Sequence, residues 1–195
     1  MLTLWTVAGG DPLASAIELY LLAMSTGGNA PPAVQTDATN ITQADPTTAS
    51  AITKSWSLLP GTPQARQAYR LETELTLTWE ANALAFGVLV GGTFTQFSPS
   101  VGAPSFSAGA VLGAWLELRV RVLSATQARF ALFGAMGTES SYTPGTQQLS
   151  IVPVSQTLTI AAADTVSIAC YFGASNASQG AASYGSTFTI INGSA

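Results

Sequence analysis

The stretch Asp164-Thr-Val-Ser-Ile-Ala-Cys-Tyr-Phe172 alternates apolar side chains with small or polar ones. Four apolar side chains fall on one side of the extended chain: Val166, Ile168, Cys170 and Phe172. Because successive side chains of a β-strand point to opposite faces, this pattern predicts a half-buried strand. The alanines before Asp164 indicate a tight turn from a preceding strand at residues 156–160.

The same alternation recurs from residue 51 onward and is clearest at residues 69–79 and 116–123. Further strands are indicated at residues 52–59, 84–90, 93–97, 128–133, 147–152 and 186–191. Short strands separated by turn residues predict an all-β protein, an antiparallel jelly-roll sandwich. The predicted inward residues are Leu71, Leu75, Leu77, Leu118, Val120, Val166, Ile168, Cys170 and Phe188.

The first 50 residues differ from the rest. Residues 25–50 are rich in Gly, Pro, Thr and Ala and have almost no large apolar side chain, which is typical of a linker or a surface loop. Residues 14–24 fit either a helix or a strand. We therefore expect an N-terminal arm and linker at 1–50 and one jelly-roll β domain at 51–195.

Charged residues make up only 8% of the chain, against about 25% in typical globular proteins. No run of about 20 apolar residues could form a membrane helix. We therefore expect the chain to cover part of its surface by homo-oligomerisation, with no membrane partner. The predicted interface residues are Trp115, Leu123, Ala169, Tyr171 and Ile191, which fall on outward faces or out of phase with the core.

The charge pattern argues against several functions. The net charge is −4 and there is no run of basic residues, so no nucleic-acid partner is expected. The chain has no histidine, which removes the commonest general base and metal ligand. Cys170, the only cysteine, is expected to be a buried, inert thiol. We expect no catalytic residues, no cofactor and no metal.

Glu72 and Glu74 lie two residues apart on one strand face, a spacing that a pair of catalytic carboxylates could use. The structural interpretation is favoured, because Arg70, Arg119 and Arg121 can pair with these carboxylates across strands. We expect Arg119 and Arg121 to lie near Glu72, Glu74 or Glu117. Such exposed pairs contribute about 0.2–1 kcal/mol each.

Aromatic residues are scattered among the strands. Trp79 has the inward phase of its strand and is expected in the core, whereas Trp115 is out of phase with its apolar neighbours. Tyr142 and Tyr184 fall in segments expected to be loops, where they are candidates for exposed contacts.

The segments 52–90, 114–118, 157–160, 164–171 and 186–190, taken in this order, resemble single jelly-roll, tumour necrosis factor-like structural proteins of tailed bacteriophages. The resemblance covers about residues 51–195 and implies a virion structural protein at the capsid surface, of the head decoration or head fibre type. It further implies a homotrimer that binds the major capsid protein or other virion proteins. The alternative is a receptor- or glycan-binding module of a phage tail tip or fibre. No functional residue carries over, because the family has no diagnostic motif.

Overall fold

The computed structural model describes residues 33–58, 67–80, 83–97, 108–138 and 149–191, and every regular element in them is a strand. A larger sheet contains β1 (Ala33–Asp37), β2 (Ile41–Ala44), β5 (Ala68–Trp79), β8 (Ala110–Ser124), β9 (Gln127–Thr138), β10 (Leu149–Thr159) and β12 (Gly180–Ile191). A smaller sheet contains β3 (Ser50–Ala51), β4 (Trp56–Ser57), β6 (Leu84–Val90), β7 (Thr93–Gln96) and β11 (Thr165–Phe172).

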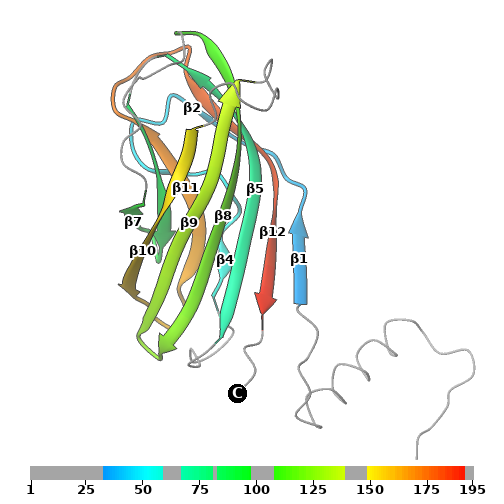
Figure 1. Ribbon diagram of the computed structural model, residues 1–195, viewed down its shortest axis with the longest axis vertical. Helices are drawn as coiled ribbons and strands as arrows, with labels where there is room; N and C mark the ends of the chain where they lie inside the picture. The colour runs from blue at the N-terminus through cyan, green and yellow to red at the C-terminus, as the bar shows by residue number, and fades with distance from the viewer. Residues whose placement is uncertain (1–32, 59–66, 81–82, 98–107, 139–148, 192–195) are drawn as a thin grey trace, which may run out of the picture.

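The two sheets form the layers of a sandwich (Figure 1). The larger sheet has the order β1-β12-β5-β8-β9-β10, with β2 also paired to β12. The smaller sheet has the order β3-β11-β6-β7, with β4 also paired to β11, and all neighbouring strands are antiparallel. The chain crosses between the sheets after β2, β4, β5, β7, β10 and β11. The predicted class, an all-β antiparallel jelly-roll sandwich, is confirmed.

The core lies between the inner faces of the two sheets and follows the period-2 alternation of the sequence. All nine predicted inward residues are at most 2% exposed, and Trp79 is also buried. Phe188 of β12 lies between two other rings, with centroid distances of 5.4 Å to Trp56 and 5.5 Å to Tyr69. Burial raises the pKa of the Cys170 thiol to about 12, so the thiolate form is disfavoured at neutral pH.

Residues 33–50 differ from the linker that we expected there. β1 and β2 both pair with β12, and β3 pairs with β11, so this segment belongs to the two sheets. The strands are held by backbone hydrogen bonds to β12 and β11, which need no large apolar side chains. Residues 1–32, including the ambiguous segment 14–24, lie outside the described residues. That they form an N-terminal arm stays a prediction.

The expected strand at 52–59 is not continuous in the structure. Within its described residues, only Trp56–Ser57 form a strand, and the short strand β3 precedes it. The two short strands β3 and β4 flank Thr53, whose Oγ1 accepts a hydrogen bond of 3.0 Å from the backbone N–H of Ile168. The threonine side chain thus satisfies a buried donor of β11 that a regular ladder would have paired with a carbonyl group.

Asp45 fastens the connection between β11 and β12. Its carboxylate accepts hydrogen bonds from the Ser175 hydroxyl, from the backbone N–H of Asn176 at 3.0 Å and from the Gln179 side chain at 2.6 Å. These donors, the Ser175 hydroxyl first, hold the pKa of Asp45 below its ordinary value of 3.8. Asp45 has a positive φ of 45°, a conformation that Asp and Asn tolerate better than most residues.

Asp45→Asn keeps the tolerance for positive φ and removes the charge. Because the folded-state pKa of Asp45 is lowered, its stabilisation is present above its unfolded-state pKa and is lost as the pH falls through the folded value. We expect wild type to unfold at higher denaturant concentration than Asp45→Asn at pH 6, with the difference shrinking below pH 3.8. Denaturant unfolding followed by tryptophan fluorescence from pH 7 to pH 2 measures it. A difference independent of pH would contradict this role.

Candidate functional site

The outer face of the larger sheet carries the large apolar side chains that the core leaves out. Six such side chains are 39–59% exposed in the described part of the chain: Val34, Val111, Trp115, Leu123, Tyr184 and Ile191. All six belong to β1, β8 or β12, and none lies on the smaller sheet. Val111, Trp115 and Leu123 share the odd phase of β8, whose even-numbered residues 112–122 are buried. We call this surface the outer face.

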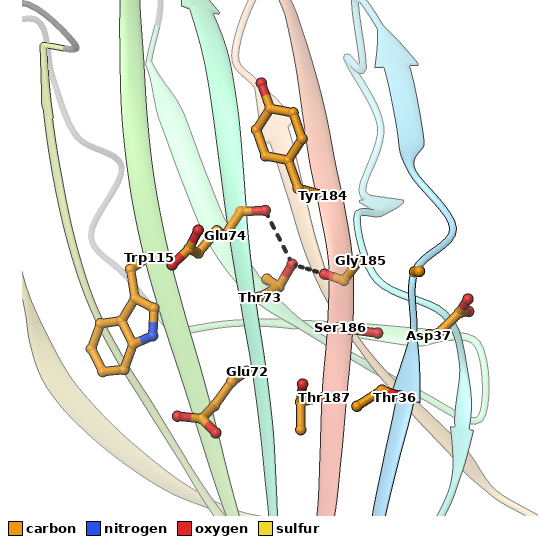
Figure 2. A pocket seen from close by; sticks show the side chains of 11 residues that line it. Thr36, Asp37, Glu72, Thr73, Glu74, Trp115, Tyr184, Gly185, Ser186 and Thr187 are labelled. Atoms are coloured by element: carbon orange, nitrogen blue, oxygen red, sulfur yellow. Dashed lines mark hydrogen bonds between the residues drawn. The ribbon is translucent and has the colours of Figure 1, made fainter.

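An open hollow of about 370 Å³ lies on the outer face, where β1, β12, β5 and β8 meet (Figure 2). A bulge in β12 between Ser183 and Ser186 forms part of its wall. At the bulge, the Thr73 hydroxyl donates to the Gly185 carbonyl at 2.7 Å. Gly185 has φ +104°, and a Cβ there would lie 2.4 Å from the carbonyl oxygen of Asp37, so only glycine fits.

Aromatic and acidic side chains line this hollow. Trp115 lies directly opposite Glu74 across β5 and β8, and the Tyr184 hydroxyl lies 2.7 Å from the Thr76 hydroxyl. Figure 2 shows Glu72 and Glu74 on the same strand beside Trp115. The arrangement offers two ring faces and several acceptor oxygens to a bound molecule, and it repels anions.

Asp37 lines the same hollow but is already engaged by its own chain. The Thr39 side chain, followed by the Thr39 backbone N–H at 3.0 Å, holds the pKa of Asp37 below its ordinary range. The Lys54 ammonium lies 3.9 Å from the Asp37 carboxylate and 5.0 Å from the centre of the Trp56 ring. Asp37 is therefore less available to a ligand than Glu74, which is exposed.

A second hollow of about 400 Å³ lies on the outer face toward the other end of the strands. Four arginines are among its lining residues: Arg70, Arg119, Arg121 and Arg129. Arg70 lies opposite Arg119, and Arg121 lies opposite Arg129. Like charges opposite one another are unfavourable, so this end of the face attracts negative charge.

The two ion pairs on β5 and β8 run along their strands and not across them, which corrects our expectation for Arg119 and Arg121. The Arg70 Nε lies 3.1 Å from the Glu72 carboxylate, and the Arg119 guanidinium pairs with Glu117 on its own strand. The register places Glu72 opposite Glu117, so each carboxylate is paired with the arginine two residues away on its own strand. Arg121 forms no ion pair with a described residue.

The predicted interface residues divide between the two sheets. Trp115, Leu123 and Ile191 are exposed on the outer face, as expected. Tyr171 lies on β11 of the smaller sheet, half-buried, and its hydroxyl donates to Gln96 at 3.1 Å. Whether any of them forms an interface stays a prediction.

The outward exposure expected for Ala169 is wrong, because this residue is completely buried. It pairs with Gly87 on one side and Ala51 on the other. The Phe94 ring packs so closely over Gly87 that a Cβ there would lie 2.6 Å from a ring carbon. Side chains of β7 thus cover this side of the smaller sheet, and alternation along β11 alone could not reveal them.

The sequence analysis missed Val34, Val111 and Arg129 as parts of the outer face. The phase of β8 could have identified Val111, since it shares the odd positions of Trp115 and Leu123. Arg129 joins the other arginines only through the pairing of β8 with β9. Tyr184 is exposed as expected, but it lies on β12 and not in the expected loop, and Tyr142 lies outside the described residues.

Other kinds of site are not found in the described residues. No three Asp, Glu, Cys or His side chains among them come together as ligands for a metal ion. The same residues contain no helix with the length and apolarity needed to cross a bilayer.

No protein-family model matches the sequence, and no curated protein matches it. Among solved structures, peanut lectin with a 9-residue peptide is 11% identical with a TM-score of 0.32, covering 83% of this chain and 98% of that one. The infectious bursal disease virus VP2 subviral particle is 16% identical with a TM-score of 0.28, covering 84% of this chain and 42% of VP2. A legume lectin-like domain from Entamoeba histolytica is 6% identical with a TM-score of 0.26, covering 76% and 88%. TM-scores below 0.5 support no inference about binding or function.

Arg119→Ala leaves the carboxylate of Glu117, which is only 5% exposed, without its cation. We expect the free energy of unfolding to fall by about 1–2 kcal/mol, because a buried charge loses its partner while the exposed arginine end is screened by water. Adding Glu117→Gln should recover part of this loss. Denaturant unfolding of dilute protein measures it, and Arg121→Ala, on the same strand and face, is the control, expected to change stability by less than about 0.5 kcal/mol. Equal losses for Arg119→Ala and Arg121→Ala would contradict the pairing.

Proposed function

We propose that this chain is a virion structural protein of the capsid decoration or head fibre type, which binds the capsid shell as an oligomer. The observation that carries the proposal is that the six large apolar side chains exposed in the described part of the chain all lie on one face of the sandwich. Large apolar side chains exposed together on one face are typical of association surfaces. A β-sandwich that leaves one broad face for association is suited to assembly as an oligomer.

The composition supports the same function. With only 8% charged residues, the chain has few of the side chains that keep a monomer's surface solvated. The sequence has no histidine, and the carboxylates Glu72 and Glu117 are held by arginines. These features favour a binding role over an enzymatic one. The N-terminal residues 1–32 supply a second attachment segment in this proposal.

Copy number in purified particles tests the location. Quantitative mass spectrometry of particles from the source of this sequence should find hundreds of copies for a shell protein, whereas a few copies would indicate a tail and none would overturn the proposal. Leu123→Asp should reduce binding to particles that lack the protein, because it places a charge on the outer face, through which the copies associate into the oligomer that binds the shell. Thr93→Asp, exposed on the smaller sheet, is the matched control.

Deletion of residues 1–32 should leave the sandwich folded and weaken attachment to particles.

A second candidate function is glycan binding in the hollow of Figure 2. Trp115 and Tyr184 offer aromatic faces, and Glu72 and Glu74 offer carboxylate oxygens. Sugars present C–H groups that pack on aromatic rings and hydroxyl groups that donate to carboxylates. The negative charge favours neutral sugars over sialic or uronic acids.

Trp115→Ala tests this candidate, because it removes one ring from the hollow. We expect a neutral oligosaccharide that binds wild type to lose at least tenfold in affinity, or about 1.4 kcal/mol. Val111→Ala, four residues away on the same face of β8, is the control and should bind normally. A glycan array followed by titration calorimetry measures binding. Absence of binding to every neutral glycan, or equal losses for both variants, would reject glycan recognition.

A further inference from the structure

The charges of the outer face are arranged in rows across β5 and β8. Successive outward residues on a strand are two positions apart, or about 6.8 Å. An arginine row contains Arg121 and, on β9, Arg129. The next row contains Arg70 and Arg119, and the row after it contains Glu72 and Glu117. We call these two the ion-pair rows, because the arginines of one pair with the carboxylates of the other. The last is the Glu74 row, in which Glu74 lies opposite Trp115. Positive charge thus lies toward one end of the two antiparallel strands and negative charge toward the other.

The two ion-pair rows neutralise one another within the chain, whereas the rows flanking them do not. The ion pairs among the described residues are Lys54–Asp37, Arg70–Glu72 and Arg119–Glu117. Arg121, Arg129 and Glu74 form none with the described part of the chain, although Arg129 donates to the Ser155 hydroxyl at 2.7 Å. The arginine row and the Glu74 row are about 20 Å apart at the strand spacing, so they cannot pair with each other inside one molecule.

The uncompensated charges lie at equal distances on either side of one line. This line crosses the strands above the paired core residues Leu71 and Leu118. Arg121 is three residues from Leu118 in one direction, and Trp115 is three residues from it in the other. On β5, Glu74 is three residues from Leu71. Opposite charges placed symmetrically about a line are the condition for a self-complementary two-fold contact.

We propose that two copies of this chain associate face to face through the outer face, related by a two-fold axis along this line. The rotation places the arginine row of each copy over the Glu74 row of the other. Arg121 then meets Trp115 and Glu74 of the second copy, a cation over an aromatic ring beside a carboxylate. The two ion-pair rows likewise exchange partners across the contact.

Apolar and small side chains fit the same rotation. Leu123 lies two residues beyond Arg121, and Gly113 lies two residues beyond Trp115. The rotation therefore places the exposed Leu123 over Gly113 of the second copy, where the absence of a side chain leaves room. A two-fold axis parallel to the strands would instead place arginine on arginine, which like-charge repulsion disfavours.

The overlapping area is adequate for a dimer. Four rows over five strands cover about 27 by 24 Å, or roughly 650 Å² of flat surface before side-chain relief is counted. A standard interface covers about 800 Å² on each partner. The inference deepens the proposed function, from which it takes the outer face as the association surface, but it concerns the isolated protein without particles.

A charge swap tests the dimer. Wild type should sediment as a dimer of twice 19.9 kDa at micromolar concentration, weakening as salt screens the exposed charges. Arg121→Glu alone and Glu74→Arg alone should each weaken dimerisation at least tenfold, because each places like charges together across the contact. The two substitutions combined should restore the wild-type dimer within about threefold, since opposite charges again meet.

We expect both single variants to fold like the wild type. Arg121→Glu places a carboxylate opposite Arg129, and Glu74→Arg places a guanidinium two residues from Glu72, so each new charge has an opposite charge in its own chain. Ser57→Glu with Thr93→Glu lowers the net charge by the same two units as Arg121→Glu, on exposed positions of the smaller sheet, and should leave the dimer intact.

Sedimentation velocity and light scattering give the decisive outcomes. A monomeric wild type, a trimer indifferent to Arg121→Glu, or a combined variant no better than either single one would overturn the two-fold contact. Particle attachment is measured separately, so a dimer without particle binding would count against the virion function alone. Neutral-glycan binding that leaves the dimer undisturbed would also overturn the contact, because the dimer covers Trp115.

Discussion

The packing of β12 and β5 against the smaller sheet is the interaction on which the rest of the structure depends. Phe188 lies between Trp56 and Tyr69, with ring centroids about 5.5 Å apart, and so joins β12, β4 and β5. Each such ring contributes about 1.5–3 kcal/mol by burial, and stacked pairs contribute more. The Trp56 Nε1–H also donates to the Ser186 hydroxyl at 3.3 Å, which fixes the ring across the gap between the sheets. Once β12 is held in this way, β1 and β2 have a strand edge to pair with.

Fixing the inward residues also fixes the outer face. In a strand with period 2, every choice of a core residue places its neighbours on the opposite side. On β8 the even-numbered residues from 112 to 122 point inward. The odd-numbered residues therefore lie outside: Val111, Trp115, Glu117, Arg119, Arg121 and Leu123. The exposed apolar side chains, the acidic hollow and the arginine row therefore all follow from which residues of each strand point into the core. The exposed features of the outer face therefore come from side chains of regular strands.

The position of Ala169 shows where strand alternation ceases to be informative. The smaller sheet is covered on its outer side near Gly87, because Phe94 folds over it and meets Tyr171 edge to face at 5.7 Å. On the larger sheet, the described residues leave the Trp115 side chain 39% exposed. Two residues with the same outward phase thus have opposite environments. The difference comes from β7, a four-residue strand whose pairing with β6 brings the ring into place.

The sequence alone determined the all-β class, the inward residues of β5, β8 and β11, the burial of Cys170 and the exposure of Trp115, Leu123 and Ile191, because each follows from alternation within a single strand. Tertiary structure decided what depends on pairing between distant segments. The strands at Ala33–Asp37 and Ile41–Ala44 exist because β12 offers hydrogen bonds to them, and their own side chains give no apolar signal. The arginine row exists because β8 and β9 pair in a register that sets Arg121 beside Arg129, and the same-strand ion pairs exist because the register of β5 and β8 sets Glu72 beside Glu117. Register between strands is set by the whole sandwich, so a single strand's sequence cannot contain it.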